Sequence, residues 1–144
     1  MKIVAKNKRA RFDYDIESSV EAGLVLKGTE VKSVKDGAVS LKGSYVRFVG
    51  GRPVLTGAHI SHYKPASKQH DAERDRSILL HKSEIDKLFA ARQNGRFIIP
   101  LAIGIVRGLV KLEIGIGTSR KQHDKREHIK RRDSKRQIQR RLKR

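Results

Sequence analysis

The chain has 144 residues, of which 34 are Lys or Arg and 15 are Asp or Glu, giving a formal net charge of +19. This length allows one domain with one core, and so dense a positive charge attracts polyanions, nucleic acid first and an anionic membrane second. The absence of cysteine excludes disulfides and thiolate metal sites, and no apolar run approaches the roughly 20 residues that span a bilayer.

The first residues of the chain do not have the pattern of a secretion signal. They lack the apolar stretch that follows the charged start of such a signal. A chain without cysteine also fits a reducing compartment. We therefore expect a cytoplasmic protein without a membrane partner, in a compartment where polyanionic RNA is abundant.

In the first half of the chain, alternation and glycine placement predict the elements. Apolar and polar residues alternate over residues 20–26, which predicts a half-buried strand. Residues 29–36 predict a short helix that buries Val31 and Val34. Residues 45–49 and 54–60 flank two glycines, which supply the positive φ of a tight hairpin turn.

The second half predicts a loop, a helix and a second hairpin. The polar residues 63–76 predict the loop. Ser83 can cap a helix over residues 84–93, which Asn94 and Gly95 end. Residues 97–106 and 109–116 flank Arg107-Gly108 as a hairpin that is apolar on both faces in places and hence deeply buried. Its glycines permit sharp bends or a close backbone approach.

These elements predict a mainly β fold, an OB-type closed small barrel with two or three flanking helices and a basic C-terminal tail. A β-sandwich is the alternative, but it leaves the helix after Ser83 without an obvious place. The distribution of charge marks a boundary between a body and the tail, because residues 118–144 hold 13 Lys or Arg and 3 Asp or Glu, a net +10. The preceding 117 residues carry a net +9. We predict an RNA-binding body over residues 1–117, beginning with a basic segment, and a tail over residues 118–144.

The tail has the composition of a nucleic-acid-binding segment. It is composed mainly of good helix formers, but its few apolar residues cannot form a core and its cations repel one another. We expect it to be disordered when free and helical when RNA neutralises it on the ribosome. A solubility tail and a membrane-surface helix are the alternatives, and the latter lacks the apolar face it would need.

The aromatic content favours folded RNA over generic single strands. Phe and Tyr total seven and Trp is absent, and we expect several of the seven to fill the core. Few rings would then remain for stacking bases, which favours recognition through backbone and shape. No zinc-finger or basic-zipper pattern points to DNA.

No catalytic motif is present in the sequence. It contains no His-Glu-x-x-His pair, Walker loop or Gly-x-Ser-x-Gly elbow. His70-Asp71 and His123-Asp124 would have to hold a metal for phosphodiester hydrolysis, but adjacent residues rarely point at one ion and the cluster of carboxylates is missing. We therefore expect no enzyme, cofactor, metal site or small-molecule substrate.

Six local strings resemble the SsrA-binding protein (SmpB) family, and their order along the chain makes the resemblance specific from about Lys6 to Arg144. In sequence order they begin at Lys8 (KRARFDY), Glu21 (EAGL), Gly28 (GTEVKS), Ala58 (AHIS), Leu79 (LLHK) and Asp124 (DKR).

The resemblance implies an RNA-binding adaptor. Such a protein binds the transfer-RNA-like domain of transfer-messenger RNA and delivers it to stalled ribosomes for trans-translation. The resemblance further implies that the tail occupies the decoding centre and the empty mRNA channel, against small-subunit ribosomal RNA. A structural ribosomal protein with a basic extension is the alternative. We expect a monomer.

The resemblance also assigns residues by position. The candidates for binding transfer-messenger RNA are Lys8, Arg9, Tyr14, Glu21, Leu79 and Lys111. The candidates for the decoding centre and mRNA channel are His123, Asp124, Lys125, Arg126, Lys130, Arg131, Ile138 and Leu142. Glu21 repels phosphate but can accept a hydrogen bond from a base or a 2′-hydroxyl. Without the resemblance, Glu21 reads as an exposed acid on an alternating strand and Leu79 as a core residue.

Overall fold

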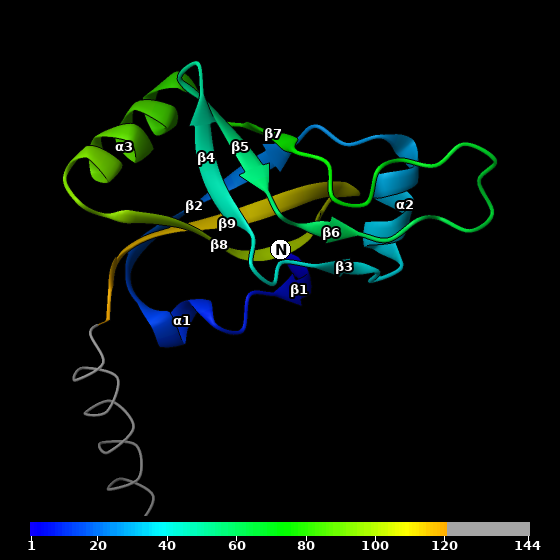
Figure 1. Cartoon of the computed structure of the whole chain (residues 1–144), viewed down its shortest axis with the longest axis horizontal. Helices are drawn as coiled ribbons and strands as arrows, with labels where there is room; N and C mark the ends of the chain where they lie inside the picture. The colour runs from blue at the N-terminus through cyan, green and yellow to red at the C-terminus, as the bar shows by residue number, and fades with distance from the viewer. Residues whose placement is uncertain (121–144) are drawn as a thin grey trace, which may run out of the picture.

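The computed structural model describes residues 1–120 of the chain (Figure 1). Within this range the elements are, in order, β1 (Lys2–Lys6), α1 (Ala10–Asp13), β2 (Tyr14–Leu24), α2 (Gly28–Lys35), β3 (Val39–Ser40), β4 (Tyr45–Val49), β5 (Arg52–Thr56), β6 (His59–Ile60), β7 (Arg76–Leu79), α3 (Lys82–Gln93), β8 (Phe97–Val106) and β9 (Leu109–Ser119). The fold is therefore mainly β with three helices, as the sequence predicts at this coarser level.

Seven of the strands form one antiparallel sheet in the order β1-β8-β9-β2-β7-β5-β4, and β3 pairs with β6 in a separate ribbon. The long strands β2, β8 and β9 form its centre, and residues far apart in the chain meet there. No hydrogen-bonded ladder joins the two edge strands β1 and β4 among the described residues. The closed barrel predicted from the sequence is therefore not confirmed, because the sheet stays open between these edges.

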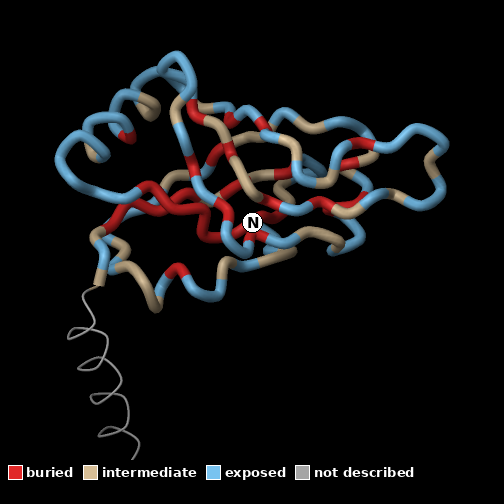
Figure 2. The backbone as a smooth tube through the Cα atoms, viewed as in Figure 1, coloured by how far each residue is buried: buried red, intermediate tan, exposed pale blue. Residues whose placement is uncertain are grey.

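The main core is aliphatic and lies against the central strands, where Figure 2 shows buried backbone concentrated on β8 and β9. Ile103, Leu112 and Ile114 are fully buried there, which confirms the prediction of a deeply buried second hairpin. Val34 and Leu88 contribute from α2 and α3. None of the seven Phe and Tyr side chains is in the buried class. The expectation that several rings fill the core was therefore wrong, because branched aliphatic side chains occupy this space.

Both predicted hairpin turns are confirmed by backbone conformation. Gly50 and Gly51 have φ of 56° and 79°, and Arg107 and Gly108 have φ of 50° and 78°. Two consecutive residues with positive φ match the twist of the flanking strands. Glycine at the second position of each turn adopts this conformation without the steric penalty of a side chain.

Two helices begin earlier than the sequence analysis placed them. The residue that caps α3 is His81, so the prediction of Ser83 as the cap was wrong. The carboxylate of Glu84 accepts a hydrogen bond from the backbone N–H of His81 at 3.1 Å, and this bond closes the first turn. Glu30 does the same for the N–H of Lys27 in α2, at 2.8 Å. In both helices an acid in the third position fixes the start.

Several elements have no counterpart in the sequence analysis. Strand β1 pairs with β8, helix α1 follows it, and β7 pairs with both β2 and β5. Strand β9 also continues to Ser119, two residues past the predicted boundary at Gly117, where it pairs with the first residues of β2. The sheet therefore extends into the segment that the charge pattern assigned to the tail.

Candidate RNA-binding surface

One face of the sheet carries three of the six predicted RNA contacts side by side. Glu21 on β2 lies directly opposite Glu113 on β9, and Gly23 lies opposite Lys111 on β9 and Leu79 on β7. Cross-strand partners point to the same side of a sheet. Glu21, Lys111 and Leu79 therefore share one face, which we call the Glu21 face.

A β-bulge places Tyr14 on this same face. Tyr14 precedes Glu21 by seven residues, and an odd separation would put the two side chains on opposite sides of a regular strand. The register with β9 shifts between Ile16 and Ser18, where β2 has one extra residue. Tyr14 therefore pairs with Ser119, an even number of residues from Glu113, and returns to the Glu21 face.

Leu79 is a surface residue. Its exposed fraction is 57%, which contradicts the alternative interpretation of Leu79 as a core residue. It lies over Gly23, where a Cβ would come within 3.3 Å of the Leu79 Cβ. Together with Lys111 and Leu109 these residues line a shallow hollow of about 210 Å³. An exposed apolar side chain beside a cation suits contact with a ribose or base next to a phosphate.

The remaining two candidates, Lys8 and Arg9, lie in the turn between β1 and α1, and both are exposed. Helix α1 packs Ala10 against Ile99 and Leu101, and Tyr14 packs against the same small cluster. The predicted contacts thus fall into two groups, Lys8, Arg9 and Tyr14 at one end of β2 and Glu21, Leu79 and Lys111 toward the other. Tyr14 and Glu21 are six ladder positions apart, because the bulge takes up one residue, and at roughly 3.3 Å per position this separates them by roughly 20 Å.

The tail starts beside the first of these groups. The backbone N–H of Arg120 donates to the carbonyl oxygen of Asp13 at 2.9 Å, and its Nε donates to that of Tyr14 at 3.4 Å. The eight candidates for ribosome contact, from His123 to Leu142, lie outside the described residues. The point at which this segment joins the body is nevertheless fixed, because Arg120 is hydrogen-bonded to Asp13 and Tyr14 at the start of β2.

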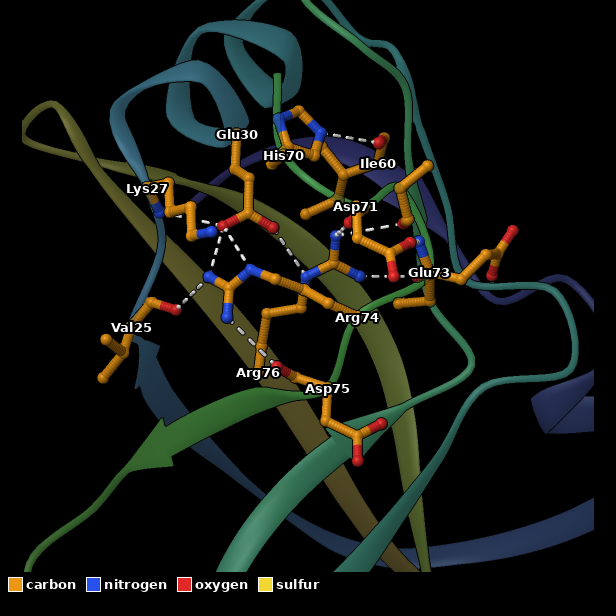
Figure 3. Close-up of polar contacts among 12 residues, drawn as sticks. Val25, Lys27, Glu30, Ile60, His70, Asp71, Glu73, Arg74, Asp75 and Arg76 are labelled. Carbon is orange, nitrogen blue, oxygen red and sulfur yellow. Dashed lines mark hydrogen bonds and ion pairs between the residues drawn. The ribbon is translucent and has the colours of Figure 1, made fainter. Parts of the chain in front are cut away.

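At the opposite end of the molecule, a buried ionic cluster ties the 61–75 loop to helix α2 (Figure 3). The side chains of Glu30 and Arg76 are both 0% exposed and are joined at 2.7 Å. The second carboxylate oxygen of Glu30 accepts hydrogen bonds from Arg74. Arg76 also donates to the carbonyl oxygens of Ala58 and Ala72 at 2.6 and 3.0 Å. Because Arg76 is the first residue of β7, the cluster positions the strand that ends at Leu79.

The electrostatics of this cluster favour the ionised carboxylate. Burial is the largest single influence on the pKa of Glu30 and raises it, but hydrogen bonds from Arg74, from the Lys27 amide and from Arg76 together outweigh burial. The pKa of Glu30 therefore lies below its ordinary value. On the surface nearby, a hydrogen bond from Arg47 lowers the pKa of Asp75 in the same direction.

His70 has a structural role in the described part of the chain. Its Nε2 donates to the carbonyl oxygen of Ile60 at 2.9 Å, and its Nδ1 lies 2.8 Å from the Thr29 hydroxyl. Both ring nitrogens are thus engaged by the protein. Within residues 1–120 no three His, Asp or Glu side chains are grouped as metal ligands would be. His123 and Asp124, the other pair considered for a metal, lie outside the described residues.

No helix within residues 1–120 is both long and apolar enough to cross a bilayer.

Sequence reasoning missed several residues of this surface. Glu113, opposite Glu21, attracted no attention because its partner strand was unknown, and like charges directly opposite are otherwise unfavourable. At the other end of the molecule it missed the ionic cluster, because the partly exposed Arg74 and the buried Arg76 lie in the polar stretch that predicts a loop. The signal that could have revealed the cluster is Glu30, because this acid lies in a short helix beside the apolar residues Val31 and Val34 and would need a cation there.

The fold and this surface define a class of protein, the small basic β-rich proteins whose sheet face combines cations, hydrogen-bond acceptors and exposed apolar side chains for a polyanion. Comparison with known proteins specifies the family. A family model described as "SmpB protein" matches residues 4–144. The chain belongs to the SmpB family, which confirms the resemblance seen in the sequence.

Relatives and a solved structure agree with this assignment. An SsrA-binding protein of Ruminiclostridium cellulolyticum is 48% identical over 145 residues, covering 99% of this chain and 94% of that protein. Those of Acetivibrio thermocellus and Halalkalibacterium halodurans are 47% and 46% identical, each over 144 residues and with the same coverage of both chains. A solved structure described as "tmRNA-SmpB: a journey to the center of the bacterial ribosome" matches with a TM-score of 0.67 and 38% identity, covering 86% of this chain and 92% of that chain.

Proposed function

We propose that this protein is an RNA-binding adaptor for trans-translation. It binds the transfer-RNA-like domain of transfer-messenger RNA and acts with that RNA at stalled ribosomes. The observation that carries the proposal is the Glu21 face. Three predicted contacts from strands β2, β7 and β9 meet there in a chain of net charge +19 that belongs to the SmpB family.

The chemistry of this face supports selective contact with RNA. Lys111 supplies attraction to phosphate that is independent of sequence. Glu21 and Glu113 supply paired acceptors, which suit the donors of a 2′-hydroxyl or a base amino group. Lys8, Arg9 and Tyr14 extend the contact along the sheet toward the start of the tail.

The tail completes the proposal. Residues His123 to Arg126, together with Lys130, Arg131, Ile138 and Leu142, contact small-subunit ribosomal RNA in the decoding centre and the empty mRNA channel. Support comes from the family membership, whose match runs to residue 144, and from the attachment of Arg120 to the body. The curled seven-stranded sheet serves as a partly open OB-type barrel for this task. The protein is a cytoplasmic monomer without a cofactor and catalyses no reaction.

Competitive binding across a range of salt concentrations tests the proposal. Full-length protein is titrated with the transfer-RNA-like domain against an ordinary transfer RNA. We expect the preference for the cognate domain to persist at high salt, because hydrogen bonds to RNA donors are less sensitive to ions than phosphate contacts are. A preference that vanishes as salt rises would contradict the adaptor role and favour a structural ribosomal protein.

Two variants separate the proposed contacts within this experiment. Lys111→Ala should weaken binding to both RNAs and reduce the salt slope by about one unit. Glu21→Ala should reduce mainly the preference for the cognate domain. The matched controls are Lys87→Ala and Asp86→Ala, since both residues are exposed on α3, away from the Glu21 face. They should leave the preference unchanged.

A further inference from the structure

An open groove of about 660 Å³ is lined by residues of α1, of the start of β4 and of the segment that joins α3 to β8. Figure 1 shows where these elements lie in the fold. Its lining combines aromatic rings and cations, namely Arg9, Tyr14, Tyr45, Arg92, Arg96 and Phe97. We call it the Tyr45 groove. It adjoins the place where the chain leaves the sheet, because Nε of Arg120 donates a hydrogen bond to the carbonyl oxygen of Tyr14.

The rings of the Tyr45 groove are open to solvent. Tyr45 is 52% exposed and Phe97 is 45% exposed, although neither is needed to fill the core. Phe97 leans against Tyr14 with their ring centroids 5.3 Å apart and their planes inclined by 50°. Tyr14 in turn packs against Ile99 and Leu101. Phe97 is therefore supported from behind, and three of the seven aromatic rings of the chain gather at one groove.

The cations of the groove are held by weak surface contacts. Arg9 lies 3.5 Å from Asp13, and Arg96 lies 3.3 Å from Glu17. The Arg92 guanidinium lies 5.5 Å from the centre of the Phe48 ring. Exposed ion pairs contribute little to stability and exchange readily with other anions. Three arginines face a single lining acid, Asp13, so the groove is positive overall.

From this combination we infer that the Tyr45 groove binds an unpaired RNA nucleotide. Its base stacks on Tyr45, and the adjoining phosphates exchange places with the surface acids that pair with Arg9 and Arg96. A base inside an RNA helix offers no free face to a protein ring, whereas a base from a loop or bulge does. The inference rests on the proposed RNA-binding function and adds to it a site for one base.

The chain's own tail is a poor occupant for this groove. Residues 121–144 contain 12 Lys or Arg, 3 Asp or Glu and no aromatic residue, a net charge of +9. Such a segment is repelled by three arginines and brings no ring to stack on Tyr45. A polyanion with a flat apolar group satisfies both features of the groove.

The test uses two fluorescein-labelled strands of five ribose-phosphate units, one with a single central adenine and one with no base. Their charges are equal, so the ratio of their dissociation constants for the full-length protein isolates the base. We expect the strand with adenine to bind at least about fivefold more tightly, the lower end for stacking on one ring. Tyr45→Ala should bring this ratio close to one, whereas Tyr45→Phe should keep it.

Tyr63→Ala provides the matched control, because Tyr63 is a partly exposed ring in the 61–75 loop at the other end of the molecule (Figure 1). It should leave the ratio unchanged. A ratio near one for the unmodified protein, or an unchanged ratio in Tyr45→Ala, would overturn the inference. If the protein still prefers the transfer-RNA-like domain in that case, only the groove is refuted and the proposed function stands.

Competition identifies the source of the nucleotide. The adenine-containing strand is displaced either with the transfer-RNA-like domain or with vacant small ribosomal subunits. If the transfer-RNA-like domain displaces the strand from the Tyr45 groove, the base belongs to transfer-messenger RNA. If small ribosomal subunits displace it, the base belongs to ribosomal RNA. In each case the Tyr45→Ala variant should lose the base-dependent part of the competition. Displacement by neither would overturn the inference.

Discussion

Ser33 in α2 is 2% exposed, and its hydroxyl has no hydrogen-bond partner within the described part of the chain. A buried hydroxyl without a partner is unfavourable, and alanine is also the better helix former. We therefore predict that Ser33→Ala raises the free energy of unfolding by about 1 kcal/mol. Urea denaturation of the full-length protein measures the change.

Ser83→Ala is the natural comparison for this prediction. Ser83 is exposed and lies one residue inside α3, since His81 is the capping residue. Loss of a true N-cap would cost about 1 kcal/mol, so the variant should instead change stability by less than about 0.5 kcal/mol. Destabilisation by Ser33→Ala, or a full capping loss at Ser83, would contradict these assignments.

At this scale the sequence could identify residues whose role depends on near neighbours. Gly50 and Gly51 were predictable, because a tight turn needs positive φ whatever surrounds it. Leu79 was ambiguous, since its exposure depends on Gly23 of another strand. Arg76 was not predictable as a buried residue, because only the folded chain brings Glu30 within 2.7 Å of it.

Helix α2, the 61–75 loop and strand β7 are joined through Glu30. Glu30→Gln removes the charge that compensates Arg74 and Arg76, and breaking a buried pair in this way costs about 3–5 kcal/mol. We predict this loss of unfolding free energy near neutral pH. Glu73→Gln is the matched control in the same loop, because the Glu73 side chain is 61% exposed. Its loss should be below about 1 kcal/mol.

The dependence on pH follows from the lowered pKa of Glu30. A carboxyl group with a folded-state pKa below its unfolded value stabilises the fold fully above the unfolded pKa, 4.5 for this residue. This stabilisation is lost as the pH falls below 4.5 toward the folded value. The difference between wild type and Glu30→Gln should therefore shrink as the pH is lowered through this window. A difference independent of pH would contradict the role of the ionised carboxylate.

Among the elements, those with strong local signals were predictable and those that depend on long-range pairing were not. The two hairpins and α3 carry their turns and caps within a few residues. Strand β1 joins the sheet only because β8 offers a free edge, and β7 is a short strand between β2 and β5. The bulge in β2 left no sequence signature, because its extra residue is defined by the register with β9.

For the whole molecule, the division between body and tail gives a prediction for a chain ended at Arg120. All six candidate contacts for transfer-messenger RNA remain in that chain, as do the hydrogen bonds from Arg120 to Asp13 and Tyr14. We expect it to keep its preference for the cognate domain but to bind all RNA more weakly with a smaller salt slope, because it loses a net charge of +9. It should no longer support ribosome rescue.

Competitive binding and a reconstituted rescue reaction measure the two halves of this prediction. Ending the chain at Gly117 instead would remove the partners of Tyr14 and Asp15 on β9, so the two truncations should differ in stability. Loss of the cognate preference in a folded chain of residues 1–120 would contradict the assignment of selectivity to the body.

At the scale of the whole molecule, composition and family resemblance predicted the class of partner and the β-rich body. The arrangement of the predicted contacts was not available from the sequence, because their common face depends on strand register. The same limit applies to the Tyr45 groove, whose lining comes from three separate parts of the chain. The closed barrel was over-specified, since short alternating segments do not reveal whether the edges of a sheet meet.

The bulge in β2 also sets a parity rule for aligning relatives with this chain. Tyr14 and Glu21 share a face here only because one extra residue lies between them. A relative with one residue fewer in this interval needs no bulge to keep both side chains on the Glu21 face, whereas a relative of equal length does. If an alignment shows a gap of one residue here and the bulge is also lost, Tyr14 and Glu21 still share a face. If the bulge remains, the two side chains point to opposite faces of the sheet.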